Sequence, residues 1–154
     1  MIKIEYPAYK YKIEKRGDKE VIFDTVRKQW VNLSPEEWVR QNFLQYLLQV
    51  KLYSPALIAV EKEIYLGALK KRCDIIVYDQ SATALMIVEC KAMEVELDIK
   101  TVEQTLRYNM SLPVKYLVVT NGKNCFAFER SLQDFKMLNA IPSFMPLPDT
   151  TKTV

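Results

Sequence analysis

Two apolar runs near the middle of the chain limit the possible folds most strongly. Residues 73–79 read CDIIVYD and residues 84–92 read ALMIVECKA, with a short polar turn around Gln80 and Ser81 between them. Short apolar runs bounded by turn residues are typical of buried β-strands. The two runs therefore predict a hairpin inside a sheet, and a buried sheet needs other elements to cover its faces.

The flanking segments supply further strands and two helices. Ser34 suits the N-cap of a helix through residue 50, Pro35 its first position, and Glu36 and Glu37 its positive dipole end. A second helix is expected in the later part of 93–112, ending before Pro113. Strands are expected at the following segments: a hairpin at 13–24 with its tip at Gly17, extended chain at 26–33, and strands at 56–66, 114–122 and 124–130.

This order predicts an α/β (α+β) fold with a mixed central sheet flanked by helices and an N-terminal β-hairpin. At 154 residues the chain is expected to form a single domain, 1–154. Residues 1–33 would be the hairpin extension and 34–130 the core. Residues 131–154 would begin with a short helix and finish as an irregular tail.

Composition excludes several kinds of chemistry. The chain has no histidine, so a Ser-His-Asp site, a Cys-His site or a His-ligated zinc centre cannot be built. Its three cysteines lack C-x-x-C spacing, which argues against a zinc site or a disulfide framework. No apolar run could span a bilayer, and no signal-peptide core is seen at the N-terminus. A cytoplasmic protein without membrane contact is expected.

Three charged residues stand at the ends of the central hairpin. Asp74 opens the first run, and Glu89 and Lys91 close the second. In an antiparallel hairpin Asp74 lies roughly opposite position 88 or 89, while Glu89 and Lys91, two apart, share one face. Two carboxylates, the main-chain carbonyl of Cys90 and waters suit a hard divalent ion such as Mg²⁺. The alternative is a set of solvated strand ends with a cross-strand Glu–Lys pair.

The ordered motifs around this hairpin resemble the PD-(D/E)XK nuclease superfamily, and within it the N-terminal nuclease domain of type I restriction enzyme R subunits and their small stand-alone relatives. The matching segments are LSPEEWVRQ, RCDIIVYD, IVECKA, QTLRYN and LVVTNG, between residues 33 and 122. Cys73 replaces the usual proline of the first motif. The resemblance implies a restriction-endonuclease-like fold and metal-dependent cleavage of DNA phosphodiester bonds.

The resemblance also implies roles for individual residues. Asp74 and Glu89 would hold Mg²⁺ (Mn²⁺ as an alternative), Lys91 would assist the attacking water, and Glu37 would be the acid of the first helix. Glu36 is the other candidate, and an S-x-x-E capping box explains Glu37 equally well.

Further residues are candidates for nucleic-acid contacts. Gln104 and Tyr108 form a Q-x-x-x-Y pattern on one helical face, which in RecB-like members lies beside the active site. Lys71 and Arg72 either contact phosphates or lie in a solvated turn. Glu61 is expected to be an edge or surface charge.

The expected partner is DNA. R subunits couple their nuclease to a helicase motor, but no phosphate-loop motif occurs in these 154 residues. A helicase, translocase or specificity subunit would then be on another chain. The alternative function is a non-catalytic nucleic-acid-binding or structural domain that retains the nuclease fold.

Overall fold

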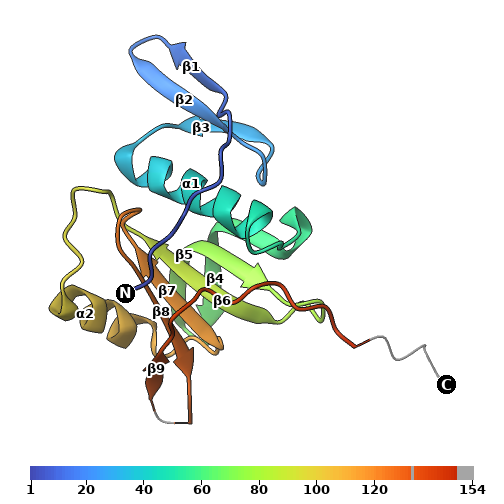
Figure 1. Cartoon of the computed structure of the whole chain (residues 1–154), viewed down its shortest axis with the longest axis vertical. Helices are drawn as coiled ribbons and strands as arrows, with labels where there is room; N and C mark the ends of the chain where they lie inside the picture. The colour runs from blue at the N-terminus through green and yellow to red at the C-terminus, as the bar shows by residue number, and fades with distance from the viewer. Residues whose placement is uncertain (133, 149–154) are drawn as a thin grey trace.

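The computed structural model describes residues 1–132 and 134–148. It contains a six-stranded mixed sheet, a separate three-stranded sheet and two α-helices (Figure 1). This confirms the expected mixed α+β fold with a helix-flanked central sheet and an N-terminal hairpin. Among the described residues, no helix is long and apolar enough to cross a membrane.

The central sheet follows chain order. Its strands are β4 (Ile58–Leu66), β5 (Leu69–Tyr78), β6 (Ala84–Cys90), β7 (Tyr116–Thr120), β8 (Cys125–Arg130) and β9 (Phe135–Met137). Neighbours pair antiparallel except β6 and β7, which are parallel and joined through helix α2 (Ile99–Asn109). The hairpin predicted from the two apolar runs is β5–β6, with Ile75 opposite Val88.

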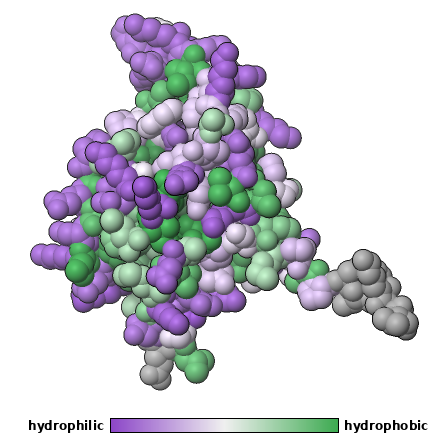
Figure 2. All heavy atoms as spheres, in the orientation of Figure 1, coloured by the Kyte–Doolittle hydropathy of each residue, from purple (hydrophilic) through white to green (hydrophobic). Residues whose placement is uncertain are grey.

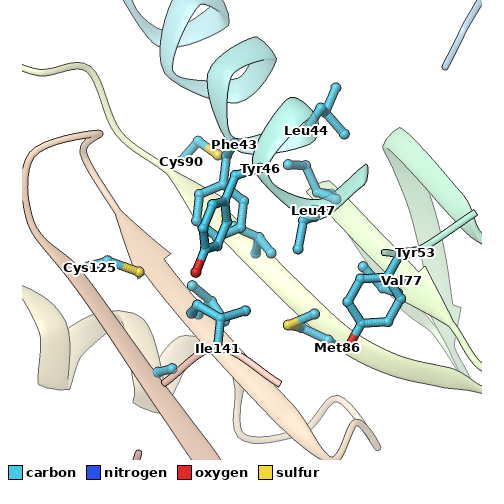
Figure 3. Packing of buried hydrophobic residues seen from close by; sticks show 14 of the residues in the cluster. Phe43, Leu44, Tyr46, Leu47, Tyr53, Val77, Met86, Cys90, Cys125 and Ile141 are labelled. Atoms are coloured by element: carbon cyan, nitrogen blue, oxygen red, sulfur yellow. The ribbon is translucent and has the colours of Figure 1, made fainter. Parts of the chain in front are cut away.

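The two helices cover opposite faces of this sheet. Helix α1 (Pro35–Gln49) packs Phe43 and Leu47 onto Val77 and Met86, as Figure 3 shows. On the other face, Val102 of α2 packs with strand residues of β7 and β8. Because adjacent side chains of a strand point to opposite faces, the continuous apolar runs are explained by this double cover.

The N-terminal sheet consists of β1 (Ile13–Arg16), β2 (Lys19–Asp24) and β3 (Gln29–Asn32), paired antiparallel in that order. The extended segment after the predicted hairpin is therefore its third strand. In Figure 1 this sheet projects beyond α1, away from the central sheet.

The C-terminal segment differs from its prediction in one element. The short helix expected after residue 131 is wrong, because β9 forms there and pairs with β8 through Arg130 opposite Phe135. The edge of β8 offers unpaired backbone groups, which a strand satisfies and a short helix does not. The irregular tail packs back onto the sheet, with Ile141 buried and the Tyr53 hydroxyl donating to the Pro142 carbonyl at 2.7 Å. Residues 149–154 lie outside the described part.

Candidate functional site

Asp74 lies where β5 and β6 stop pairing. The last paired residues are Ile75 and Val88, and beyond them the Asp74 carboxylate accepts a hydrogen bond from the Cys90 amide at 2.8 Å. The other carboxylate oxygen accepts from Arg40 of α1 at 2.9 Å. Asp74 therefore replaces one rung of the ladder and lies against the peptide group that joins Glu89 to Cys90.

Glu89 is close to Asp74 but differs from it in its surroundings. Val88 and Cys90 on either side pack in the α1-side core, so Glu89 projects from the α2 side of the sheet. Burial raises the pKa of Glu89, and the negative charge of Asp74 raises it further. Among the described residues, Glu89 accepts no side-chain hydrogen bond and forms no ion pair. It is thus a half-buried carboxylate that is incompletely neutralised.

Lys91 contributes positive charge at the same place. Its amide continues the strand by donating to the Thr120 carbonyl at 2.8 Å. Its ammonium favours the ionised forms of both Glu89 and Glu36, although it forms no ion pair within the described residues. Convergence of Asp74, Glu89 and Lys91 on one ion stays a prediction.

Glu37 occupies a different environment at the start of α1. Its amide donates to the Ser34 hydroxyl at 3.0 Å, which confirms the N-cap. Its carboxylate does not complete a capping box but is buried, pairs with Arg27 and Arg40, and accepts from the Gln41 side chain at 2.9 Å. Glu37 therefore has its hydrogen-bonding capacity filled by residues of the chain itself.

Arg40 is the cation that joins the first helix to the candidate site. It pairs with Glu37 and Asp74, and its Nη2 also lies 3.3 Å from both Glu36 and Glu61. Burial lowers the pKa of Arg40, but the carboxylates of Glu37 and Asp74 raise it by more, so the guanidinium stays charged. Its planar group, with several N–H donors, suits this bridging position.

Arg27 connects the N-terminal sheet to the same network. It binds Asp24 at 2.7 Å, Glu37 at 2.6 Å and Glu61 at 3.1 Å. Glu61 lies on β4, the edge strand of the central sheet, which confirms the expectation of an edge charge. It also accepts from Arg72 at 3.1 Å and so belongs to this network.

Glu36 is the half-exposed acid of the first helix. Burial and the charge of Asp74 both raise its pKa, while Arg40 and Lys91 lower it. Of the two candidate acids, Glu36 is the one whose charge interacts with Glu89, as the raised pKa of Glu89 also reflects.

The residues expected to touch nucleic acid differ in exposure: one is buried and three are exposed. Lys71 is buried, donates to the Tyr108 carbonyl at 2.7 Å and lies 3.5 Å from the centre of the Tyr108 ring. Burial lowers the pKa of Lys71, and the nearby Glu89 opposes that shift. Gln104 and Tyr108 are exposed on α2, and Arg72 is exposed on β5. Their contacts with nucleic acid stay predictions.

A polar cleft runs along β3, the edge strand of the N-terminal sheet. Its volume is about 560 Å³, and its lining includes Arg27, Trp30, Asn32, Glu36, Arg40 and Glu61. The cleft therefore leads from the N-terminal sheet to Arg40 and Glu36, beside Asp74.

The cysteines of this region are buried, and burial disfavours their thiolate forms. Burial raises the pKa of the Cys73 thiol to about 11 and that of the Cys90 thiol well above its ordinary value. Cys90 points into the α1-side core, as expected from its place between Glu89 and Lys91. Only its main-chain carbonyl remains as a candidate metal ligand.

Sequence reasoning missed Arg27, Asp24 and the bridging role of Arg40. Gln41 could have been found, because it lies four residues after Glu37 on the same helical face. Arg27 leaves no such signal, since it lies in a turn and its partner Glu61 is 34 residues away.

The family comparison covers most of the chain. A family model described as the type I restriction enzyme R protein N terminus matches residues 35–142. The comparison with curated proteins found no match. The matched range contains α1, the central sheet, Asp74, Glu89 and Lys91, whereas β1–β3 lie before it. The chain belongs to the family of type I restriction enzyme R protein N-terminal domains.

Proposed function

We propose that this domain is a Mg²⁺-dependent nuclease that hydrolyses DNA phosphodiester bonds at the open end of the β5–β6 hairpin. The observation that carries the proposal is Glu89, a half-buried carboxylate beside Asp74 whose pKa is raised by burial and by that neighbour. Holding two acids together is unfavourable unless a cation or a proton relieves them. The family match supports the same type of chemistry.

The donor set fits a hard cation that keeps most of its water. Within 1–132 and 134–148, no three Asp, Glu, Cys or His side chains lie close enough to hold a metal ion alone. Mg²⁺ needs no such cage, because it is commonly bound by one or two carboxylates and several waters. Asp74, Glu89 and the Cys90 carbonyl would be its ligands here, and Mn²⁺ would fit the same oxygen donors.

The residues have separate tasks in the proposed reaction. A bound cation would supply a more acidic water and neutralise charge on the phosphate. The Cys90 amide and Arg40 fix the direction of the Asp74 carboxylate. Lys91 would donate a hydrogen bond to the attacking water or to a phosphate oxygen, and so offset negative charge that builds up as the P–O bond breaks.

A second function is favoured by one contact. Arg40 already neutralises Asp74 at 2.9 Å, so a guanidinium stands beside an oxygen that a metal ion would use. A domain in which Arg40 permanently replaces the cation would keep the fold and bind nucleic acid without cutting it. The second Asp74 oxygen accepts only from the Cys90 amide, which leaves it a lone pair for a metal ion, and Glu89 has no such cationic partner among the described residues, which is why we favour the nuclease.

The partners follow from the family. Type I restriction R proteins act on DNA with other subunits, and we propose DNA and a subunit on another chain as the partners of this domain.

Cleavage of plasmid and short duplex DNA with Mg²⁺ or Mn²⁺ tests the proposal. We expect Asp74→Ala, Glu89→Ala and Lys91→Ala each to reduce the rate by at least about 100-fold, as loss of a positioned catalytic group does. Glu63→Ala and Lys70→Ala remove an exposed ion pair on the same sheet and serve as controls that keep activity. A folded wild type that binds DNA but never cuts it, with either metal, would favour the non-catalytic function.

A further inference from the structure

We propose that the outward face of the β1–β3 sheet binds the sugar-phosphate backbone of duplex DNA and guides the duplex toward Asp74. This inference rests on the proposed nuclease function and adds a binding surface to it. The surface consists of Lys12, Arg16 and Lys19 together with Phe23 and Trp30, and is called the outer face below.

Charge is distributed unevenly along the chain. Residues 1–33 contain eight Lys or Arg and five Asp or Glu, while residues 34–154 contain fourteen of each. Two of the three net positive charges are carried by residues 12–32, which are Lys12 and the projecting sheet with its turns and contain six Lys or Arg and four Asp or Glu. In the matching view of Figure 2, hydrophilic residues dominate this projection. A local excess of positive charge attracts a polyanion even when the total charge is small.

The strand register assigns residues to the two faces of the sheet. Ile13, Ile22 and Val31 lie in one row, and side chains of this row point to the same side as Asp24 and Tyr11. Tyr11 packs edge to face against Trp38 of α1, and Asp24 accepts from Gln41 at 2.8 Å, so this side faces the helix.

Lys12, Arg16 and Lys19 alternate with these residues and point the other way. Lys12 lies over the Phe23 ring and Arg16 over the Trp30 ring, at 5.7 and 4.9 Å from the ring centres. Glu14 is the one acid among residues 12–16 and 19–24 on this face, so cations outnumber it three to one there, and it pairs with Arg16 at 3.4 Å.

The aromatic rings support the cations rather than offer open stacking sites. Phe23 and Trp30 pack edge to face at 5.4 Å and are half-buried, while Lys12 and Arg16 above them, and Lys19 on the same face, are exposed. Bases of a single strand need accessible rings to stack on. Exposed cations fixed on aromatic rings instead suit phosphate oxygens, which is why we assign the backbone of a duplex.

The candidate site supplies little of this attraction, because its cations are matched by as many carboxylates. The cleft along β3 contains Glu36, Glu37 and Glu61 against Arg27 and Arg40, and Asp74 and Glu89 lie beyond it. Without a bound cation, these carboxylates offset the attraction of the neighbouring cations for phosphates. Further affinity for DNA is then expected from another surface, and Arg27 holds the outer face in place by tying β2 to Glu37 and Glu61.

The family comparison does not account for this surface. The matched residues begin at 35, after β3. The outer face is thus a separate addition to the matched domain, placed next to its candidate site.

Binding of a fluorescent duplex by the full chain, without divalent metal and over a range of salt, tests the proposal. We expect Arg16→Gln/Lys19→Gln to weaken binding about tenfold and to reduce the salt dependence by about two phosphate contacts. Lys115→Gln/Lys136→Gln removes two charges from exposed lysines of the β7–β9 side and is the matched control, with binding unchanged. Asp74→Ala/Glu89→Ala should keep the salt dependence of the wild type while losing cleavage.

The outcomes separate the two proposals. If the wild type binds duplex DNA and Arg16→Gln/Lys19→Gln binds it as well as Lys115→Gln/Lys136→Gln does, the outer face is refuted and the nuclease function is not. If the wild type neither binds nor cuts DNA, the nuclease function fails and the outer face with it. If the wild type binds poly-glutamate but not the duplex, and Arg16→Gln/Lys19→Gln loses that binding, the assignment is overturned and the partner is an acidic protein.

Discussion

Two glutamates of the candidate site, Glu37 and Glu89, differ in how completely their charges are neutralised. Glu37 is 5% exposed and is held by Arg27, Arg40 and Gln41. Glu89 is half-buried beside Asp74 and has no such partner among the described residues. A buried charge whose contacts are all supplied by the chain holds the structure together, whereas one that lacks them is suited to bind something else.

The largest difference is expected in stability. Glu37→Ala should lower the free energy of unfolding by about 3 kcal/mol, because it leaves Arg27 and Arg40 without a buried partner. Glu89→Ala should change it by less than about 1 kcal/mol, since the Glu89 side chain has no hydrogen bond to lose within the part of the chain that the structure describes. Urea unfolding of the metal-free proteins measures both. Equal losses in the two variants would remove the distinction between them.

Asp74 is expected to fall between these extremes, because it is both bonded and close to Glu89. Asp74→Ala should cost about 2 kcal/mol through loss of the Arg40 pair and of the acceptor for the Cys90 amide. Asp74→Asn keeps an acceptor oxygen for that amide and should cost less. The same unfolding series measures both. An Asn variant as unstable as the Ala variant would mean that the hydrogen bond from the Cys90 amide contributes little to stability.

Lys71 tests the α2 side of the site. Lys71→Met keeps the side-chain length but loses the hydrogen bond to the Tyr108 carbonyl and the contact with its ring, which should cost about 1 kcal/mol. Faster amide exchange in the second half of α2 should accompany the loss. Exposed Lys70→Met is the control, and unchanged exchange in Lys71→Met would show that this contact does not hold the helix.

The smallest effect concerns pH. The pKa of Glu89 is raised above its ordinary value of 4.5, so folding favours its protonated form. Stability of the metal-free protein should therefore fall as pH rises from that ordinary value through the raised one, because burial and the charge of Asp74 both disfavour ionised Glu89 in the folded state. Glu36 contributes with the same sign. Glu89→Gln should flatten this part of the profile, and an unaltered profile would contradict the assignment.

Much of the fold was predictable from local patterns. The buried runs at 73–79 and 84–92, the Ser34 cap and the apolar stripe of α1 each reflect interactions close in sequence. The strand β9 was not, because Phe135 and Met137 form a strand only where the edge of β8 is available to pair with. Propensity over three residues is too weak to decide such a case.

The members of the candidate site were proposed from the sequence, but the charges that surround them were not predictable. Spacing and resemblance selected Asp74, Glu89 and Lys91. The pairing of β5 with β6 brings the strands of Asp74 and Glu89 together. That Arg40 would neutralise Asp74, and that Arg27 would reach Glu61 from another sheet, depends on contacts between residues 34 apart. No local pattern encodes those contacts.

The central claim is that Asp74 and Glu89 together hold a divalent cation. Calorimetric titration of metal-free protein with Mn²⁺, repeated with Mg²⁺, tests it most directly against the Asp74→Ala/Glu89→Ala double variant and a Glu63→Ala/Glu103→Ala control on exposed acids. We expect one binding event in the wild type and the control, and none in the double variant. Equal binding by all three proteins would contradict the claim.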